Sequence, residues 1–463
     1  MSIPVSLELA PDGARLWYKF GPGWWEIATA PNSKPTRVEA REAAAQVKLP
    51  GINGTPRLTS VEQSPDGKWT AWIDAEKPYG PSFLYCRCSE SATGKPQPLS
   101  RMPVMAFRWA SDSRSFWVIA SNVSDEPFGR MSLEGKFVSL SGGAAARSLG
   151  MAAANDVVVW VQSDGSHHGT IWVRDRAGKI RTLVDPNPQT SEWSRGWTQE
   201  VVRWNNAHGE ELQGILAVPV DGKRLPLIVD PYSSWRNRFL NIPSLGNYAF
   251  VKAGFAVFFP DHRAPHTLPE WAFGEAYVGA SKDRDPVDVL TDDVMTGVAE
   301  LVRRGVADPA RLFLYSTSNG ASAINQLLTS TTAFRAAVSH GGVSDWLSYY
   351  RANEPRGDMT IPGFLGGRKP EDSPDLYRRI SPIDHVDKIV TPLLLAVGAK
   401  DSIAGGGSRY EDAVHFSEAL RKAGRTVDFV VYPDAGHGVP GSLAEQHVRK
   451  AIEFFRSAPP LKQ

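Results

Sequence analysis

The sequence contains very little cysteine and no long apolar run. Its 463 residues include only two cysteines, Cys86 and Cys88. In a strand, side chains two positions apart point to the same face, and this spacing is too strained for an ordinary disulfide. No stretch reaches the roughly 18 apolar residues of a membrane helix, and the start lacks the pattern of a secretory signal. We therefore expect reduced cysteines, no membrane span and a cytoplasmic protein.

An excess of charge of either sign is also missing. The 51 lysines and arginines nearly cancel the 50 aspartates and glutamates, which leaves a net charge of +1. No broad basic field therefore indicates nucleic acid or an anionic membrane as a partner. Small molecules or peptides are the expected partners. The length of 463 residues predicts roughly two to three domains.

The first half carries a loose repeat of turn signals. Asp12, Asp66, Asp112 and Asp156 recur at roughly 50-residue spacing within APDG, SPDG, ASDS and ANDV, each between apolar segments. In such turns proline sets φ, aspartate bonds its own backbone and glycine supplies a positive φ, so each motif predicts a β-hairpin. Hairpin repeats of this length are typical of propeller blades. We predict an all-β, propeller-like domain of about four blades over residues 1–190.

The pattern of turn signals and apolar segments changes near residue 185, where DPNPQTSEWSRG has the composition of a linker. Beyond it, apolar strand segments alternate with helical segments, among them LPLIVDPY, FAVFFPD, RLFLYS, AAVSHG, PLLLAVG and VDFVVYPD. Such alternation predicts a mostly parallel sheet flanked by helices, here an α/β-hydrolase domain over residues 195–463. In these sheets the chemistry lies beyond the carboxyl ends of the strands.

Three residues at such strand ends form a candidate catalytic triad. Ser318 follows RLFLYS in Ser-Thr-Ser-Asn-Gly, Asp401 follows PLLLAVG, and His437 follows VDFVVYPD. The order Ser, Asp, His is that of an α/β-hydrolase, in which imidazole accepts the serine proton and the carboxylate orients the imidazole. The usual elbow is G-x-S-x-G, whereas Ser316 stands at the first glycine. Alone, this pentapeptide is equally typical of a helix N-cap.

The C-terminal half resembles the catalytic domain of the prolyl oligopeptidase family of serine peptidases. The similar segments follow the order of that family across roughly residues 200–460 and include LPLIVDPY, AGFAVFFPDHR, GVADPARLFLYSTSNGASA, FRAAVSHGGVSDW, YRRISPIDHVDKIVTPLLLAVGAKD and DFVVYPDAGHG. A propeller ahead of the catalytic domain is the architecture of the same family. The resemblance implies an oxyanion hole formed by the backbone N–H of Asn319 and the hydroxyl of Tyr232. The alternative is that Tyr232 is a core tyrosine whose hydroxyl is satisfied within the domain.

The sequence departs from the family at several points. Members usually have glycines after the tyrosine, whereas Ser-Ser-Trp-Arg follows Tyr232, and no arginine stands beside Asp401. About four blades replace the seven or eight of typical relatives. Weak candidates for substrate contacts are the side chains of Trp235, Arg236, Arg263 and His266. His262 and His266 do not fit a metal pair, because Pro265 forbids helical spacing, and neither a metal nor a cofactor is implied.

The first hypothesis is therefore a serine peptidase that acts on short or flexible peptides through an acyl-enzyme. A variant is a specialised isopeptidase, or a macrocyclase of a peptide natural product. The alternatives are an esterase or acyl-peptide hydrolase with the same triad, and a catalytically silent binding protein that kept the fold. The sequence does not fix the substrate, the closure of the propeller or the oligomeric state.

Overall fold

The chain divides near residue 195 into two compact units, one beginning at Met1 and one at Gly196. The computed structural model describes residues 5–38, 48–50, 56–58, 61–75, 82–88, 97–121, 126–141, 147–164, 167–232, 245–263, 284–353, 365, 368–402, 409–439 and 441–460. Among these residues, no helix combines the length and the apolar character that crossing a membrane requires.

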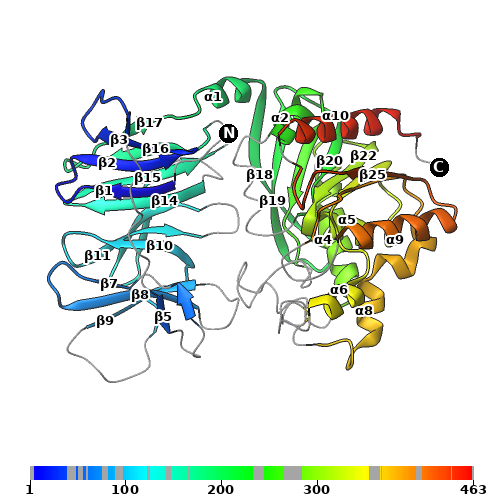
Figure 1. Ribbon diagram of the computed structural model, residues 1–463, viewed down its shortest axis with the longest axis horizontal. Helices are drawn as coiled ribbons and strands as arrows, with labels where there is room; N and C mark the ends of the chain where they lie inside the picture. Colours follow the sequence, from blue (N-terminus) through cyan, green and yellow to red (C-terminus); the bar gives the residue numbers. More distant parts are fainter. Residues whose placement is uncertain are drawn as a thin grey trace. The chain divides into compact units, whose positions relative to one another are not determined.

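The N-terminal unit consists of antiparallel sheets (Figure 1). The first contains β1 (Val5–Leu9), β2 (Arg15–Phe20), β3 (Gly23–Ala28) and β4 (Thr36–Val38), and the second contains β7 (Val61–Gln63), β8 (Trp69–Ala75) and β9 (Ser82–Cys88). The third contains β10 (Val104–Trp109), β11 (Ser115–Ala120), β12 (Phe128–Ser132) and β13 (Phe137–Ser139), and the fourth β14 (Arg147–Ala154), β15 (Val157–Ser163), β16 (Thr170–Arg174) and β17 (Ile180–Val184). A small pair is formed by β5 (Lys48–Pro50) and β6 (Pro56–Leu58).

The repeated aspartates occupy the turn between the first and second strand of each of these four sheets. The carboxylates of Asp12, Asp66 and Asp112 accept hydrogen bonds from the backbone N–H two residues later, at 2.9, 3.1 and 3.0 Å. Gly13 follows the first aspartate with φ of 71°. The turn chemistry is therefore the one that the motif predicts, and the propeller-like, blade-built fold class is confirmed.

Three of the four sheets pack in chain order, and the first sheet packs on the fourth. One apolar cluster joins the second sheet to the third, through residues such as Leu84 and Phe107, and another joins the third to the fourth, through Phe128 and Trp160. A third cluster joins Leu16 of the first sheet to Val159 of the fourth. The first sheet thus packs on the last one, as Figure 1 shows.

The two free cysteines lie on β9, where burial raises the pKa of Cys86 to about 11.

The C-terminal unit is built on one eight-stranded sheet. A short helix α1 (Gln189–Trp193) and the 3-10 turn η1 (Ser194–Gly196) lead into it. Its strands, in spatial order, are β18 (Trp197–Asn205), β19 (Glu211–Pro219), β21 (Ala256–Pro260), β20 (Leu225–Val229), β22 (Ala307–Thr317), β23 (Ala336–His340), β24 (Leu393–Gly398) and β25 (Val427–Tyr432). The strands from β21 to β25 pair in parallel, and the β18–β19 hairpin is antiparallel. The predicted α/β-hydrolase class is confirmed.

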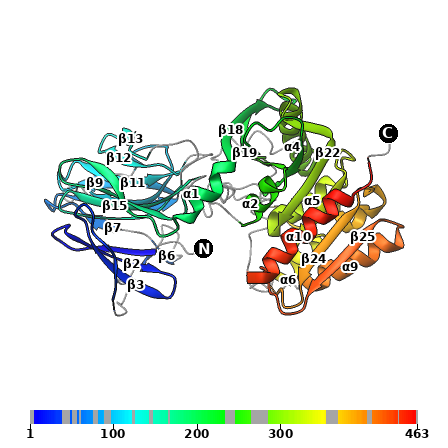
Figure 2. The same ribbon diagram turned by 90° about the horizontal axis from the view of Figure 1, so that it is seen from above.

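Helices cover both faces of this sheet (Figures 1 and 2). The helices are α2 (Leu245–Lys252), α4 (Pro286–Arg303), α5 (Ser318–Leu327), α6 (Trp346–Asn353), α8 (Pro374–Ile380), the 3-10 segment η6 (Pro382–Lys388), α9 (Arg409–Lys422) and α10 (Gly441–Ser457). Because successive side chains of a strand point to opposite faces, neighbouring residues of β22 show which helix covers each face of the sheet. Leu312 and Leu314 join the cluster that contains Phe416 of α9, whereas Phe313 meets Phe455 of α10 at a ring distance of 4.8 Å.

Candidate active site

Three loops meet at the carboxyl ends of β22, β24 and β25. Ser318 follows β22, Asp401 lies three residues after β24, and His437 lies five residues after β25. Because β22, β23, β24 and β25 are neighbours that all run in the same direction, their carboxyl ends share one edge of the sheet. The predicted triad residues are therefore brought together from positions far apart in the sequence.

A continuous chain of hydrogen bonds links these three side chains. The Nε2 atom of His437 lies 2.8 Å from the Oγ atom of Ser318, and Nδ1 lies 3.1 and 3.0 Å from the two carboxylate oxygens of Asp401. The side chain of Asp401 is fully buried, whereas that of His437 is 38% exposed. A proton on Nδ1 that points to the carboxylate leaves Nε2 as an acceptor for the serine hydroxyl. This geometry is that of a nucleophile, a base and an orienting acid.

Ser318 sits in a strained turn between β22 and α5. Its φ of 55° lies in the left-handed region, which costs a non-glycine residue about 1–3 kcal/mol. Two residues later, a Cβ on Gly320 would overlap the hydroxyl of Ser316 and lie 2.7 Å from Cβ of Tyr232. Only glycine fits at this position. The local geometry is thus that of a nucleophile elbow rather than an ordinary helix N-cap.

Ser316, at the usual place of a glycine, is accommodated by a half-buried aspartate, Asp230, that the sequence reasoning missed. Its hydroxyl donates to Oδ1 of Asp230 at 2.5 Å, and the same oxygen accepts the backbone N–H of Tyr232 at 3.0 Å. Burial raises the pKa of Asp230 to about 7, although both hydrogen bonds oppose this shift. One carboxyl group therefore ties the end of β20 to the elbow. The only signal in the sequence was an aspartate that closes the apolar run LPLIV.

The two predicted oxyanion-hole residues flank the elbow. Asn319 directly follows Ser318 in the first turn of α5. Tyr232 packs its Cβ against Gly320, and its backbone is held by Asp230. Both residues therefore lie beside the nucleophile, on different segments of the chain. Their role as hydrogen-bond donors to an oxyanion stays a prediction.

Two further polar residues surround the triad. His340 ends β23 and is buried, and burial lowers its pKa to about 4, so that its imidazole is neutral near pH 7. Arg409 at the start of α9 donates its backbone N–H to the carbonyl of Asp401 at 3.1 Å. Its buried guanidinium lies 4.4 Å from the centre of the Tyr349 ring. Residues 402–408 separate it from Asp401 in the sequence, which concealed this proximity.

Of the four weak candidates for substrate contacts, the structure describes only Arg263. Arg263 is buried and ion-paired with Asp293, at 2.6 Å, and with Glu210. These bonds occupy its guanidinium in the interior, so the structure contradicts its expected role as an open substrate contact. His262 is also buried and places Nε2 3.1 Å from the carbonyl of Pro231. The remaining candidates lie outside the described residues: Trp235, Arg236 and His266.

Comparison with known proteins matches residues 244–458 to the prolyl oligopeptidase family. The lasso peptide isopeptidase AtxE2 of Asticcacaulis excentricus is 28% identical over 56% of this chain and 37% of its own length. The uncharacterized peptidase YuxL of Bacillus subtilis is 30% identical over 44% of this chain and 29% of its own length. The chain therefore spans about a third of the length of these curated relatives.

A solved structure extends the likeness of fold to the whole chain. The acylaminoacyl peptidase of Pyrococcus horikoshii superposes with a TM-score of 0.67 at 15% sequence identity. The alignment covers 100% of this chain and 71% of that one. The blade-built N-terminal unit is thus part of a shared architecture, as is the α/β-hydrolase sheet.

Replacement of Asp230 by asparagine is expected to flatten the pH dependence of stability. Because the pKa of this carboxyl is raised to about 7, the folded chain keeps a proton that the unfolded chain has lost above about pH 4. The free energy of unfolding of the parent protein should therefore fall by about 2 kcal/mol between pH 5 and pH 8 relative to Asp230→Asn. Urea denaturation of both proteins across this range measures the difference.

Asp308→Asn is the matched control for this measurement. Asp308 lies at the start of β22, and its pKa is lowered, because its hydrogen bonds and ion pairs outweigh its slight burial. It therefore titrates below this pH range and should add no slope between pH 5 and pH 8. Parallel stability curves for the parent protein and Asp230→Asn would contradict the assignment of a raised pKa to Asp230.

Proposed function

Because the chain belongs, through its C-terminal domain, to the prolyl oligopeptidase family of serine peptidases, we propose that it hydrolyses short or flexible peptides through an acyl-enzyme on Ser318. The observation that carries this proposal is the hydrogen-bonded chain from Ser318 through His437 to Asp401. Each of its members holds the position that its chemical role requires.

Acylation begins with the proton on the hydroxyl of Ser318. As Oγ attacks the carbonyl carbon of the scissile amide, Nε2 of His437 takes this proton across the 2.8 Å contact. The buried carboxylate of Asp401 stabilises the imidazolium that forms. His437 then gives the proton to the departing amine nitrogen, the C–N bond breaks, and an ester of Ser318 remains.

Deacylation repeats these steps with water. His437 accepts a proton from the water molecule, whose oxygen attacks the ester carbonyl, and returns a proton to Oγ of Ser318. The products are a free carboxylic acid and the restored hydroxyl. No redox step occurs, and the residues of the chain supply every proton acceptor and donor that this cycle needs.

Negative charge develops on the carbonyl oxygen in both halves of the cycle. The backbone N–H of Asn319 lies directly after the nucleophile, and Tyr232 lies against the same turn. Donors held in place before the reaction stabilise this charge without reorganisation, and one such donor is worth about 3–4 kcal/mol. In this proposal Asp230 has a positioning role, because it binds the backbone of Tyr232 and the side chain of Ser316 with a single oxygen.

The position of the nucleophile favours a flexible substrate. The scissile carbon must approach Oγ of Ser318 to about 3–3.5 Å, in line with the base. Ser318 stands in a tight turn between a buried strand and a helix, and its hydroxyl is already engaged by His437. A loose backbone segment can enter such a site more readily than a backbone that is hydrogen-bonded within a folded protein.

Hydrolysis of an isopeptide bond is the second candidate function. It is favoured by the 28% identity with the lasso peptide isopeptidase over 273 residues. An isopeptide bond is also an amide, so the same nucleophile, base and oxyanion donors would cleave it. The two candidates differ only in which carboxyl group of the substrate becomes the acyl group.

Ser318→Ala is expected to lower turnover by about 10⁴–10⁶-fold, because the nucleophile is lost. The parent protein should also become labelled by a fluorophosphonate probe, and the variant should not. Ser402→Ala, which removes an exposed hydroxyl next to Asp401, is the control and should keep near-parent activity and labelling. A folded Ser318→Ala variant with full activity, or a parent protein that resists the probe, would refute the proposed mechanism.

Tyr232→Phe tests the oxyanion hole. Loss of a hydroxyl that donates mainly in the transition state should reduce kcat by about 10²–10³-fold and change KM little. The melting temperature should remain the same, because phenylalanine keeps the shape of the ring. A rate within threefold of the parent value would instead assign Tyr232 to the core.

A matched pair of substrates separates the two candidate functions. Two peptides of identical composition are compared, one joined through a backbone carboxyl and the other through the side-chain carboxyl of the same acidic residue. The first proposal predicts a higher kcat/KM for the backbone amide. A preference of about tenfold or more for the side-chain amide, abolished by Ser318→Ala, would establish the isopeptidase instead.

A further inference from the structure

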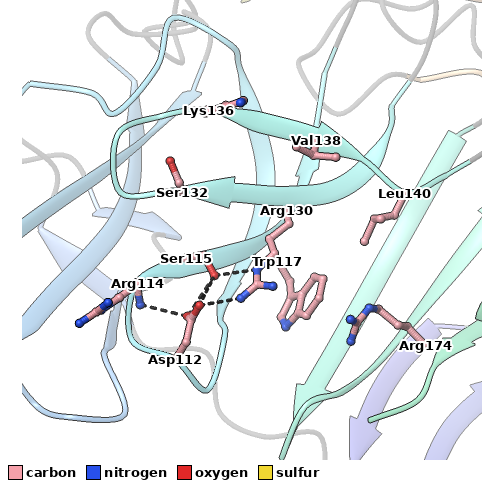
Figure 3. A pocket seen from close by; sticks show the side chains of 10 residues that line it. All are labelled: Asp112, Arg114, Ser115, Trp117, Arg130, Ser132, Lys136, Val138, Leu140 and Arg174. Carbon is pink, nitrogen blue, oxygen red and sulfur yellow. Dashed lines mark hydrogen bonds and ion pairs between the residues drawn. The ribbon is translucent and has the colours of Figure 1, made fainter. Parts of the chain in front are cut away.

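A pocket on the N-terminal unit concentrates positive charge (Figure 3). It has a volume of about 480 Å³ and is lined by residues of the third and fourth sheets. Four of its lining residues are basic, namely Arg114, Arg130, Lys136 and Arg174, and one, Asp112, is acidic. In a chain with a net charge of only +1, this is a marked local excess.

Strand pairing builds the wall of this pocket. Trp117 on β11 pairs with Arg130 on β12, which in turn pairs with Val138 on β13, so these side chains share one face of the third sheet. Arg174 reaches the same space from β16 of the fourth sheet. The guanidinium carbons of Arg130 and Arg174 lie 5.3 and 5.2 Å from the centre of the Trp117 ring.

One of the four cations of the pocket, Arg130, is held in place by an ion pair with Asp112. Arg130 donates to Oγ of Ser115 at 2.8 Å and to Asp112 at 2.6 Å, which fixes its guanidinium. This is the one ion pair that the described residues form with the four basic side chains of the pocket. Figure 3 shows Arg174 directed toward Trp117, whereas Arg114 extends away at the rim. Arg130 and Arg174 therefore keep N–H groups that can donate to a further anion.

The remaining lining residues narrow the class of ligand. Trp117 is only 3% exposed, so its ring offers no platform on which a nucleobase could stack. Val138 is 53% exposed, which adds an apolar surface beside the cations that a bare inorganic anion would not use. Planar guanidinium groups next to an aliphatic side chain match a carboxylate with a neighbouring apolar residue.

We propose that this pocket binds an acidic peptide segment, in which Arg130 and Arg174 hold a carboxylate and Val138 contacts an adjacent aliphatic side chain. The proposal concerns binding by the N-terminal unit and does not depend on turnover at Ser318. An acidic stretch of a peptide would thereby be retained by the protein at a point other than its scissile bond.

Calorimetric titration tests this inference on the full chain carrying Ser318→Ala, so that no peptide is cleaved. The probes are acetyl-Glu-Leu-Glu-Leu-amide, its Gln-Leu-Gln-Leu counterpart and inorganic phosphate. The acidic peptide should bind at least about tenfold more tightly than the amide peptide and than phosphate, and its affinity should fall as salt increases. Equal binding of the two peptides, or binding of phosphate as tight as that of the acidic peptide, would overturn the proposal.

Charge-removing variants locate the binding. Two variants should each weaken the binding of the acidic peptide: Arg174→Gln, and separately Lys136→Gln on the exposed turn before β13. Arg174→Gln should lower the affinity by about tenfold or more. Lys179→Gln removes one exposed positive charge of the same unit outside the pocket and should change the affinity less than twofold. Equal weakening by all three variants, each with an unchanged melting temperature, would show only a general charge effect and would refute the site.

Discussion

The parallel pairing of β22, β23, β24 and β25 is the constraint on which the candidate site depends. It aligns the carboxyl ends of four strands along one edge, so that the loops bearing Ser318, Asp401 and His437 meet although 119 residues separate the first from the last. The apolar clusters on both faces of the sheet hold this edge in place. The strained φ of Ser318 persists because the strand before it and the helix after it are both buried in these clusters.

The elbow shows how one departure from a common pattern is compensated in three dimensions. A serine in place of the first glycine brings an additional hydroxyl into a space that Gly320 and Tyr232 already fill. Asp230 accepts that hydroxyl and the backbone of Tyr232 with one oxygen, and thereby connects two segments that surround the nucleophile. The compensation places a titratable group beside the nucleophile elbow, where partial burial raises the pKa of this carboxyl to about 7.

The N-terminal unit uses the same physical devices in a different arrangement. Its second, third and fourth sheets pack on one another in chain order, and its first sheet packs on the fourth through Leu16 and Val159. Between the third and fourth sheets, aromatic stacking of Phe128 on Trp160 at 4.4 Å fills the interior. Toward solvent, the same pair of sheets presents Arg130 and Arg174 around Trp117. The packing of these two sheets thus forms both a core and a charged surface.

The sequence by itself determined what depends on near neighbours along the chain. The turns at Asp12, Asp66 and Asp112, the alternation of strands and helices after residue 195 and the placement of the triad residues at strand ends could all be predicted, because turn chemistry and hydrophobic periodicity are local. Only the tertiary structure decided which distant groups become partners. It buried Arg263 against Asp293 and Glu210, paired Asp230 with Ser316, and set Arg174 beside Trp117. These contacts depend on strand order, register and burial, which are set by packing across the whole domain rather than by any single segment.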